Sequence, residues 1–241
     1  MQDNTKRGEH ALFWMKVLFV LFILMFFVNN AFDESMKIMQ QESMALAVVY
    51  LVYTFVVAFG FLIASVMFLV YYFSWLHRAI ANLRVLAKLD FSPVGAIILT
   101  LIPIIGFVLH FWIFNDMAGC QEKCMEERGL LKDRFPKKLL IAWFFATLAV
   151  VVIMFQRSEM MVVNVIENLF FVTSIGLYIK FFAFYIARER ELFQFHTETL
   201  FQKRVDEAIR ERDIKRAVAQ LRENENKEVP KSENSESDQE K

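Results

Sequence analysis

The sequence predicts an all-α integral membrane protein: a helical bundle of four transmembrane helices with a re-entrant hairpin, a cytoplasmic amphipathic helix and a disordered tail. Apolar residues make up 56% of the 241 residues, and Phe alone occurs 27 times. Four stretches are long and nearly free of charge, and a helix of about 20 apolar residues crosses the hydrocarbon of a bilayer. Lys and Arg gather between these stretches and after residue 187, which is typical of loops on the cytoplasmic side.

The predicted spans are residues 12–30, 46–73, 139–156 and 160–186, so residues 1–187 form the transmembrane domain. The first apolar run resembles a signal peptide, but the Asn29–Phe32 segment after it lacks the small-residue pattern of a cleavage site. We therefore expect an uncleaved first helix. The lipid bilayer is the first predicted partner of the chain.

A fifth apolar segment, residues 92–116, is interrupted near its middle. Ser92 and Pro93 are typical of a helix start, Pro103 disfavours helix just before it, and Gly106 permits a sharp turn. Each arm has about ten residues, or about 15 Å, which is half the hydrocarbon thickness. This pattern predicts a re-entrant hairpin; a proline-kinked full span is the alternative.

The charges between the segments favour the hairpin. If all five segments crossed, the basic loop from Lys123 to Lys138 and the basic C-terminal segment would lie outside. With a hairpin, both termini and the two basic loops are cytoplasmic, and only Lys37 and Arg157 lie outside. The sequence therefore predicts cytoplasmic N- and C-termini.

Three polar residues share one face of the helix that continues from the second span. Trp75, Arg78 and Asn82 follow one another at helical spacing. They could bind a lipid headgroup, a ligand or the cytoplasmic end of the hairpin. The pattern favours the plainer interpretation, which is an anchor at the membrane interface with ordinary packing.

This region resembles a bacterial domain-of-unknown-function family of small multi-pass membrane proteins, which has a W-x-x-R-A-x-x-N-L … S-P … P signature. The resemblance covers about residues 71–127, and the matching residues are Trp75, Arg78, Ala79, Asn82, Leu83, Ser92, Pro93 and Pro103. Leu101 and Ile102 replace the family's aromatic residue before the proline, and Gly106 stands near a usual Asn. The resemblance implies a bacterial inner-membrane protein and supplies no activity.

Ionisable and amide residues inside apolar segments are the other candidate site. Glu167 lies in the last predicted span with Asn164 and Asn168 nearby, and His110 lies on the returning arm of the hairpin. An ionisable group at membrane depth is a functional-site hypothesis by default, and Asn can bond a neighbouring helix. The alternative is that Glu167 reaches water at the outer surface or is protonated inside the bundle.

No enzyme, metal or cofactor is predicted. The sequence contains no nucleophile–base pair, phosphate-binding loop or zinc-protease motif. Cys120 and Cys124 lie one helical turn apart, but a zinc site needs about four ligands, so we expect free thiols. The net charge is zero, which argues against nucleic acid as a partner.

After the last span, residues 188–222 are predicted to form an amphipathic helix in the cytoplasm, and residues 223–241 a disordered tail. The helix could pair with a second copy or a protein partner; packing on its own protein or on lipid headgroups is the alternative. The sequence thus favours an interaction or scaffold protein. The alternative function is a small channel or transporter, in which the hairpin lines a solute or ion path.

Overall fold

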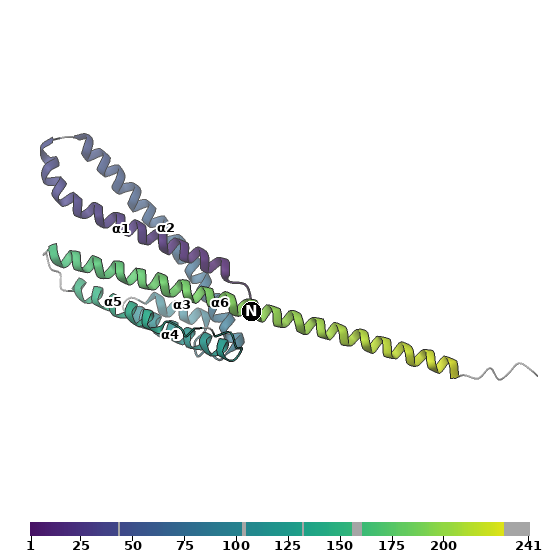
Figure 1. Cartoon of the computed structure of the whole chain (residues 1–241). Helices are drawn as coiled ribbons and strands as arrows, with labels where there is room; N and C mark the ends of the chain where they lie inside the picture. Colours follow the sequence, from purple (N-terminus) through teal and green to yellow (C-terminus); the bar gives the residue numbers. More distant parts are fainter. Residues whose placement is uncertain (43, 103–104, 132, 156–160, 229–241) are drawn as a thin grey trace, which may run out of the picture. The chain divides into compact units, whose positions relative to one another are not determined.

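The computed structural model describes residues 1–42, 44–102, 105–131, 133–155 and 161–228, which fold as helices joined by short connections (Figure 1). The helices in these residues are α1 (Thr5–Glu42), α2 (Met44–Leu86), α3 (Pro93–Leu101), α4 (Ile105–Glu126), α5 (Lys137–Phe155) and α6 (Met161–Glu228). The described residues include no strand. The predicted all-α class is confirmed.

Four of the described helices are long and apolar enough to cross a membrane, as predicted. They are the segments Thr5–Phe26, Val48–Leu86, Lys137–Phe155 and Val165–Arg222. Their outward faces are apolar: Leu51 and Phe55 of α2 are 69% and 67% exposed. Water would solvate so much apolar surface poorly, whereas lipid chains would solvate it well. These helices therefore indicate a membrane protein.

The helices extend beyond the predicted spans. α2 continues beyond the span end at residue 73, as predicted, and it ends at Leu86. α6 is a single helix of 68 residues that continues six residues into the predicted tail, ending at Glu228. The Glu- and Lys-containing sequence there supports helix. Residues 229–241 of the predicted tail lie outside the described residues.

The two arms of the predicted hairpin are α3 and α4. Ser92 caps α3, because its Oγ accepts a hydrogen bond from the Gly95 amide at 3.0 Å, and Pro93 is the first helical residue. Gly106, in the first turn of α4, lies against the end of α3. A Cβ on Gly106 would stand 2.8 Å from the Thr100 carbonyl oxygen. Pro103 lies outside the described residues.

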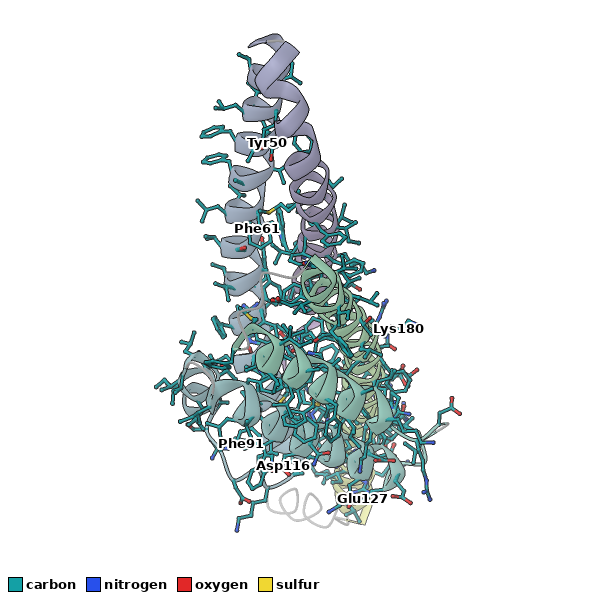
Figure 2. The ribbon with its side chains drawn as sticks, turned by 90° about the vertical axis from the view of Figure 1, so that its left-hand side faces the viewer. Tyr50, Phe61, Phe91, Asp116, Glu127 and Lys180 are labelled. Atoms are coloured by element: carbon teal, nitrogen blue, oxygen red, sulfur yellow. The ribbon has the colours of Figure 1, made fainter. Side chains whose placement is uncertain are left out.

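The chain divides into two compact units, residues 1–193 and 194–241. In the first unit, α2, α4 and α6 bury an aromatic core in which Trp75, Phe114, Phe182 and Tyr185 are 0% exposed. Figure 2 shows Tyr50 of α2 at one end of this unit, and Phe91, Asp116 and Glu127 at the other. The described part of the second unit is the last portion of α6.

Candidate functional site

The N-terminal segment, α2 and α6 meet at a buried carboxylate. The Trp75 indole Nε1 donates a hydrogen bond to Glu189 Oε2 at 2.9 Å, and Asn4 Nδ2 donates to Glu189 Oε1 at 3.0 Å. Asn4 Nδ2 also lies 3.1 Å from the Trp75 carbonyl oxygen. Glu189 is 7% exposed. We call Asn4, Trp75 and Glu189 the carboxylate site.

Asn82 holds the start of the chain in place beside this site. Its Oδ1 accepts from the Gln2 amide, and its Nδ2 donates to the Gln2 carbonyl, both at 2.9 Å. Asp3 Oδ1 accepts from the Thr5 amide at 2.9 Å, and this bond to the first residue of α1 lowers the pKa of Asp3. The N-terminal segment therefore folds back onto the end of α2.

The structure thus brings two of the three predicted docking residues into one buried region. Trp75 also stacks on Phe114 of α4, with ring centroids 6.1 Å apart, so it contacts the second arm of the predicted hairpin. Arg78 is half-buried on the same helix. Their predicted binding of a headgroup or ligand stays a prediction.

Sequence reasoning missed Glu189 and Asn4. Glu189 stands in a run of alternating charges, Arg188-Glu189-Arg190-Glu191, which is typical of a solvated helix face. In the structure Glu189 is buried and Glu191 is exposed. No signal in the sequence separates the two, because the distinction depends on which residue faces Trp75.

His110 lies in a hydrogen-bonded cluster with two tyrosines, which we call the His–Tyr cluster. His110 Nε2 is 2.8 Å from Tyr178 Oη of α6 and 3.1 Å from Tyr72 Oη of α2, and the two hydroxyls are 3.0 Å apart. Aromatic rings pack around the cluster. The ring centroids of Trp143 and Tyr178 are 4.9 Å apart, and those of Phe114 and His110 are 4.7 Å apart. Sequence reasoning identified His110 but neither tyrosine.

Glu167 is half-buried on α6, away from the His–Tyr cluster along the helix. Asn168 is half-buried and makes contacts of its own. The side chain of Asn164 lies outside the described residues. Further along α6, the Ser174 and Thr147 hydroxyls are 2.5 Å apart, which joins α6 to α5. Glu167 and Asn168 on α6 therefore lie apart from His110, which belongs to the His–Tyr cluster.

The two cysteines act as a pair at the end of α4. Cys120 is half-buried and Cys124 buried. A hydrogen bond from the Cys120 thiol, together with the nearby Arg128 guanidinium, lowers the pKa of Cys124 to about 6, while donating that bond raises the pKa of Cys120. Among the described residues, no group of three or more His, Cys, Asp or Glu side chains could hold a metal ion.

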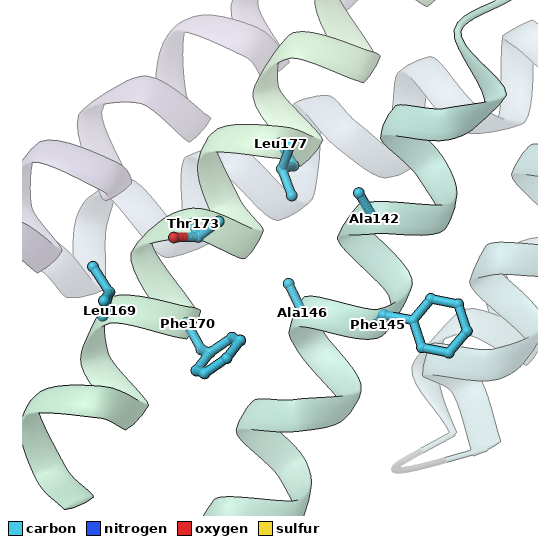
Figure 3. Close-up of a pocket in the computed structure, with 7 residues that line it drawn as sticks. All are labelled: Ala142, Phe145, Ala146, Leu169, Phe170, Thr173 and Leu177. Atoms are coloured by element: carbon cyan, nitrogen blue, oxygen red, sulfur yellow. The ribbon is translucent and has the colours of Figure 1, made fainter.

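A shallow apolar cavity of about 370 Å³ lies between α5 and α6 (Figure 3). It forms where small side chains of α5 leave space beside larger ones of α6. The lining residues are Ala142, Phe145, Ala146, Leu169, Phe170, Thr173 and Leu177. Such a lining suits an acyl chain better than a polar solute.

Arg188 connects α6 to the segment just before α5. Its guanidinium donates to the Asp133 carbonyl oxygen and lies over the rings of Phe135 and Phe184, 5.5 and 4.4 Å from their centroids. The start of α5 is therefore at the same end of the unit as the carboxylate site.

Comparisons of the chain with protein-family models, with curated proteins and with solved structures give no match. The resemblance of residues 71–127 to a domain-of-unknown-function family therefore stays a prediction.

Proposed function

We propose that this protein is a non-enzymatic membrane-anchored interaction protein, whose helical segment 194–222 associates with a second copy of the chain. One observation carries the proposal: this segment belongs to a helix that begins in a membrane-type span, yet its large apolar side chains are exposed. Phe201, Ile214 and Leu221 are 67%, 63% and 64% exposed, and Ile209 is 52% exposed. Helix pairing would bury these side chains.

The apolar residues form two short patches rather than one seam. Phe201, Val205 and Ile209 lie on one side of the helix, while Ile214, Val218 and Leu221 lie about half a turn around it. Charges of both signs flank the patches, which would allow pairing with an identical helix. This arrangement favours two short contacts over a long coiled coil.

The orientation that we propose places both termini in the cytoplasm of a bacterial cell, with α3 and α4 forming a re-entrant hairpin in the inner membrane. The charge pattern of the loops supports it. The contact of Asn82 with Gln2 supports it too, since it joins the end of α2 to the chain's start. Arg188 contacts Asp133 next to the carboxylate site. The segment between α2 and α5 would therefore enter the membrane from the cytoplasmic side and return to the same side.

Cysteine labelling tests this orientation. In a Cys120→Ser, Cys124→Ser background, we expect a cysteine replacing the exposed Glu127 to resist a membrane-impermeant maleimide in intact cells and to react after permeabilisation. The native pair is unsuitable because Cys124 is only 2% exposed. A cysteine replacing Arg157, predicted on the other side, is the matched control. Labelling of Glu127→Cys in intact cells would mean that the hairpin segment spans.

Truncation tests the self-association. We expect the full chain to form oligomers in lipid nanodiscs. A chain ending at Phe193 should be monomeric and keep the helices and the thermal midpoint of the first unit. The cut belongs after Phe193 because Glu189 and Leu192 are buried in the first unit. Light scattering coupled to size exclusion measures the mass.

Point variants sharpen the truncation experiment. Phe201→Glu with Ile214→Glu places charges in both apolar patches and should weaken association at least tenfold, whereas Gln202→Glu, exposed beside Phe201, should leave it unchanged. A full chain that is monomeric at all concentrations, or a truncated chain that still oligomerises, would contradict the proposal.

A further inference from the structure

One face of α6 carries a row of polar side chains. Glu167, Ser174, Tyr178, Tyr185 and Glu189 are separated by seven, four, seven and four residues, a spacing that puts them on one side of a helix. The row is about 33 Å long at 1.5 Å per residue, close to the hydrocarbon thickness of a bilayer. Ser174, Tyr185 and Glu189 are 5%, 0% and 7% exposed, so this face is turned into the unit.

Polar groups from other parts of the unit join this row at three levels. Thr147 of α5 bonds Ser174, and the two residues of the His–Tyr cluster outside α6, His110 and Tyr72, bond Tyr178. Trp75 and Asn4 bond Glu189 at the far end. Isolated polar contacts inside a span often do no more than join two helices. A row of polar groups that runs from one end of a span to the other is also the arrangement of a proton relay.

The chemistry of the row suits protons better than ions or solutes. Serine, threonine and tyrosine hydroxyls can each donate and accept, and an imidazole can take up a proton on one nitrogen and release one from the other. The three polar atoms of the His–Tyr cluster already lie within 3.1 Å of one another. A metal cation or a solute between them would have to separate three packed helices.

An unpartnered buried hydroxyl lies where the row approaches Glu189. The Tyr185 hydroxyl is fully buried and bonds no group in the described part of the chain. A buried polar group without a partner costs about 1–3 kcal/mol, so the Tyr185 hydroxyl favours an ordered water as its partner, at a position along α6 between Tyr178 and Glu189.

We infer that the inward face of α6 is a proton pathway across the membrane, running from Glu167 through the His–Tyr cluster to Glu189. Each group accepts a proton on a lone pair as its own proton passes to the next group. Only O–H and N–H bonds form and break, and the net change is the movement of one proton from one side to the other. The inference is independent of the proposed function, because residues 194–222 take no part in it.

A flux measurement tests this pathway. The full chain is reconstituted in liposomes containing a pH-sensitive dye, and a potassium gradient with valinomycin supplies the driving potential. We expect proton uptake at least tenfold faster than in protein-free liposomes, and a loss of at least tenfold in His110→Phe. His77→Phe, which changes an exposed histidine of α2, should conduct like the unaltered chain.

A second variant separates conduction from folding. Tyr178→Phe keeps the ring and its packing but removes the hydroxyl that bonds His110, and it should also lose flux while eluting as the unaltered chain does. Flux from the full chain no faster than in protein-free liposomes would overturn the inference. So would full conduction by a correctly folded Tyr178→Phe. Either result would leave the oligomer measurements, and thus the proposed function, unaffected.

Discussion

Trp75→Ala is expected to destabilise the first unit by about 3–5 kcal/mol, the range for removing a large buried aromatic side chain. Trp75 is 0% exposed and packs edge-on against Phe182 and Tyr185, with ring centroids 4.6 and 5.6 Å apart respectively. The substitution also removes the indole donor from Glu189 and leaves a buried carboxylate oxygen without it. Both losses act at the point where α2 meets α6.

The measurement is the thermal midpoint of the helical circular-dichroism signal in detergent. At about 2–4 °C per kcal/mol, the midpoint should fall by about 6–20 °C. Trp112→Ala is the matched control, because Trp112 is 71% exposed on α4 and should shift the midpoint by less than about 2 °C. Equal shifts in the two variants would mean that Trp75 is not at the centre of the core.

Gly106→Ala should destabilise the packing of α3 on α4 by about 1–3 kcal/mol, as overpacking of a tight contact does. The added Cβ would stand 2.8 Å from the Thr100 carbonyl oxygen and 3.0 Å from that of Leu99. Both are backbone atoms, which cannot rotate away as a flexible side chain would. The end of α3 must therefore move.

Gly119→Ala in the same helix is the control for Gly106→Ala. A Cβ on Gly119 meets no heavy atom within 4 Å, so the change should stabilise α4 by up to about 1 kcal/mol through helix propensity. Hydrogen exchange of α3 amides, read by mass spectrometry, distinguishes the two: faster exchange is expected only in Gly106→Ala. Unchanged exchange there would argue against a close contact between the helices.

Local signals in the sequence were sufficient to predict the helices, and to predict a helix boundary where a capping residue marks it. Ser92 and Pro93 indicate the start of α3 because a cap and a first-turn proline are decided by neighbouring residues. The apolar runs predict the four membrane-type helices for the same reason. The end of α2 at Leu86 was harder to predict, because no Gly or Pro stands there.

The candidate sites depended on contacts between distant residues. His110 could be singled out as a polar residue in an apolar run, but Tyr72 and Tyr178 are ordinary aromatic residues in their own helices. They become part of a site only because three helices bring their hydroxyls within 3.1 Å of His110 Nε2. The spacing of Ser174, Tyr178 and Tyr185 puts them on one face of a helix, and this much follows from the sequence. Only the structure shows that this face is turned into the unit.

The sequence by itself determined that this chain is helical and has four apolar segments suited to a membrane, since hydropathy and helix length are properties of contiguous residues. Only the tertiary structure decided which polar residues meet. Glu189 and Glu191 are the same chemical group two positions apart, and on a helix such residues point in different directions. The packing of α6 against Trp75 and Asn4 buried Glu189 and left Glu191 exposed.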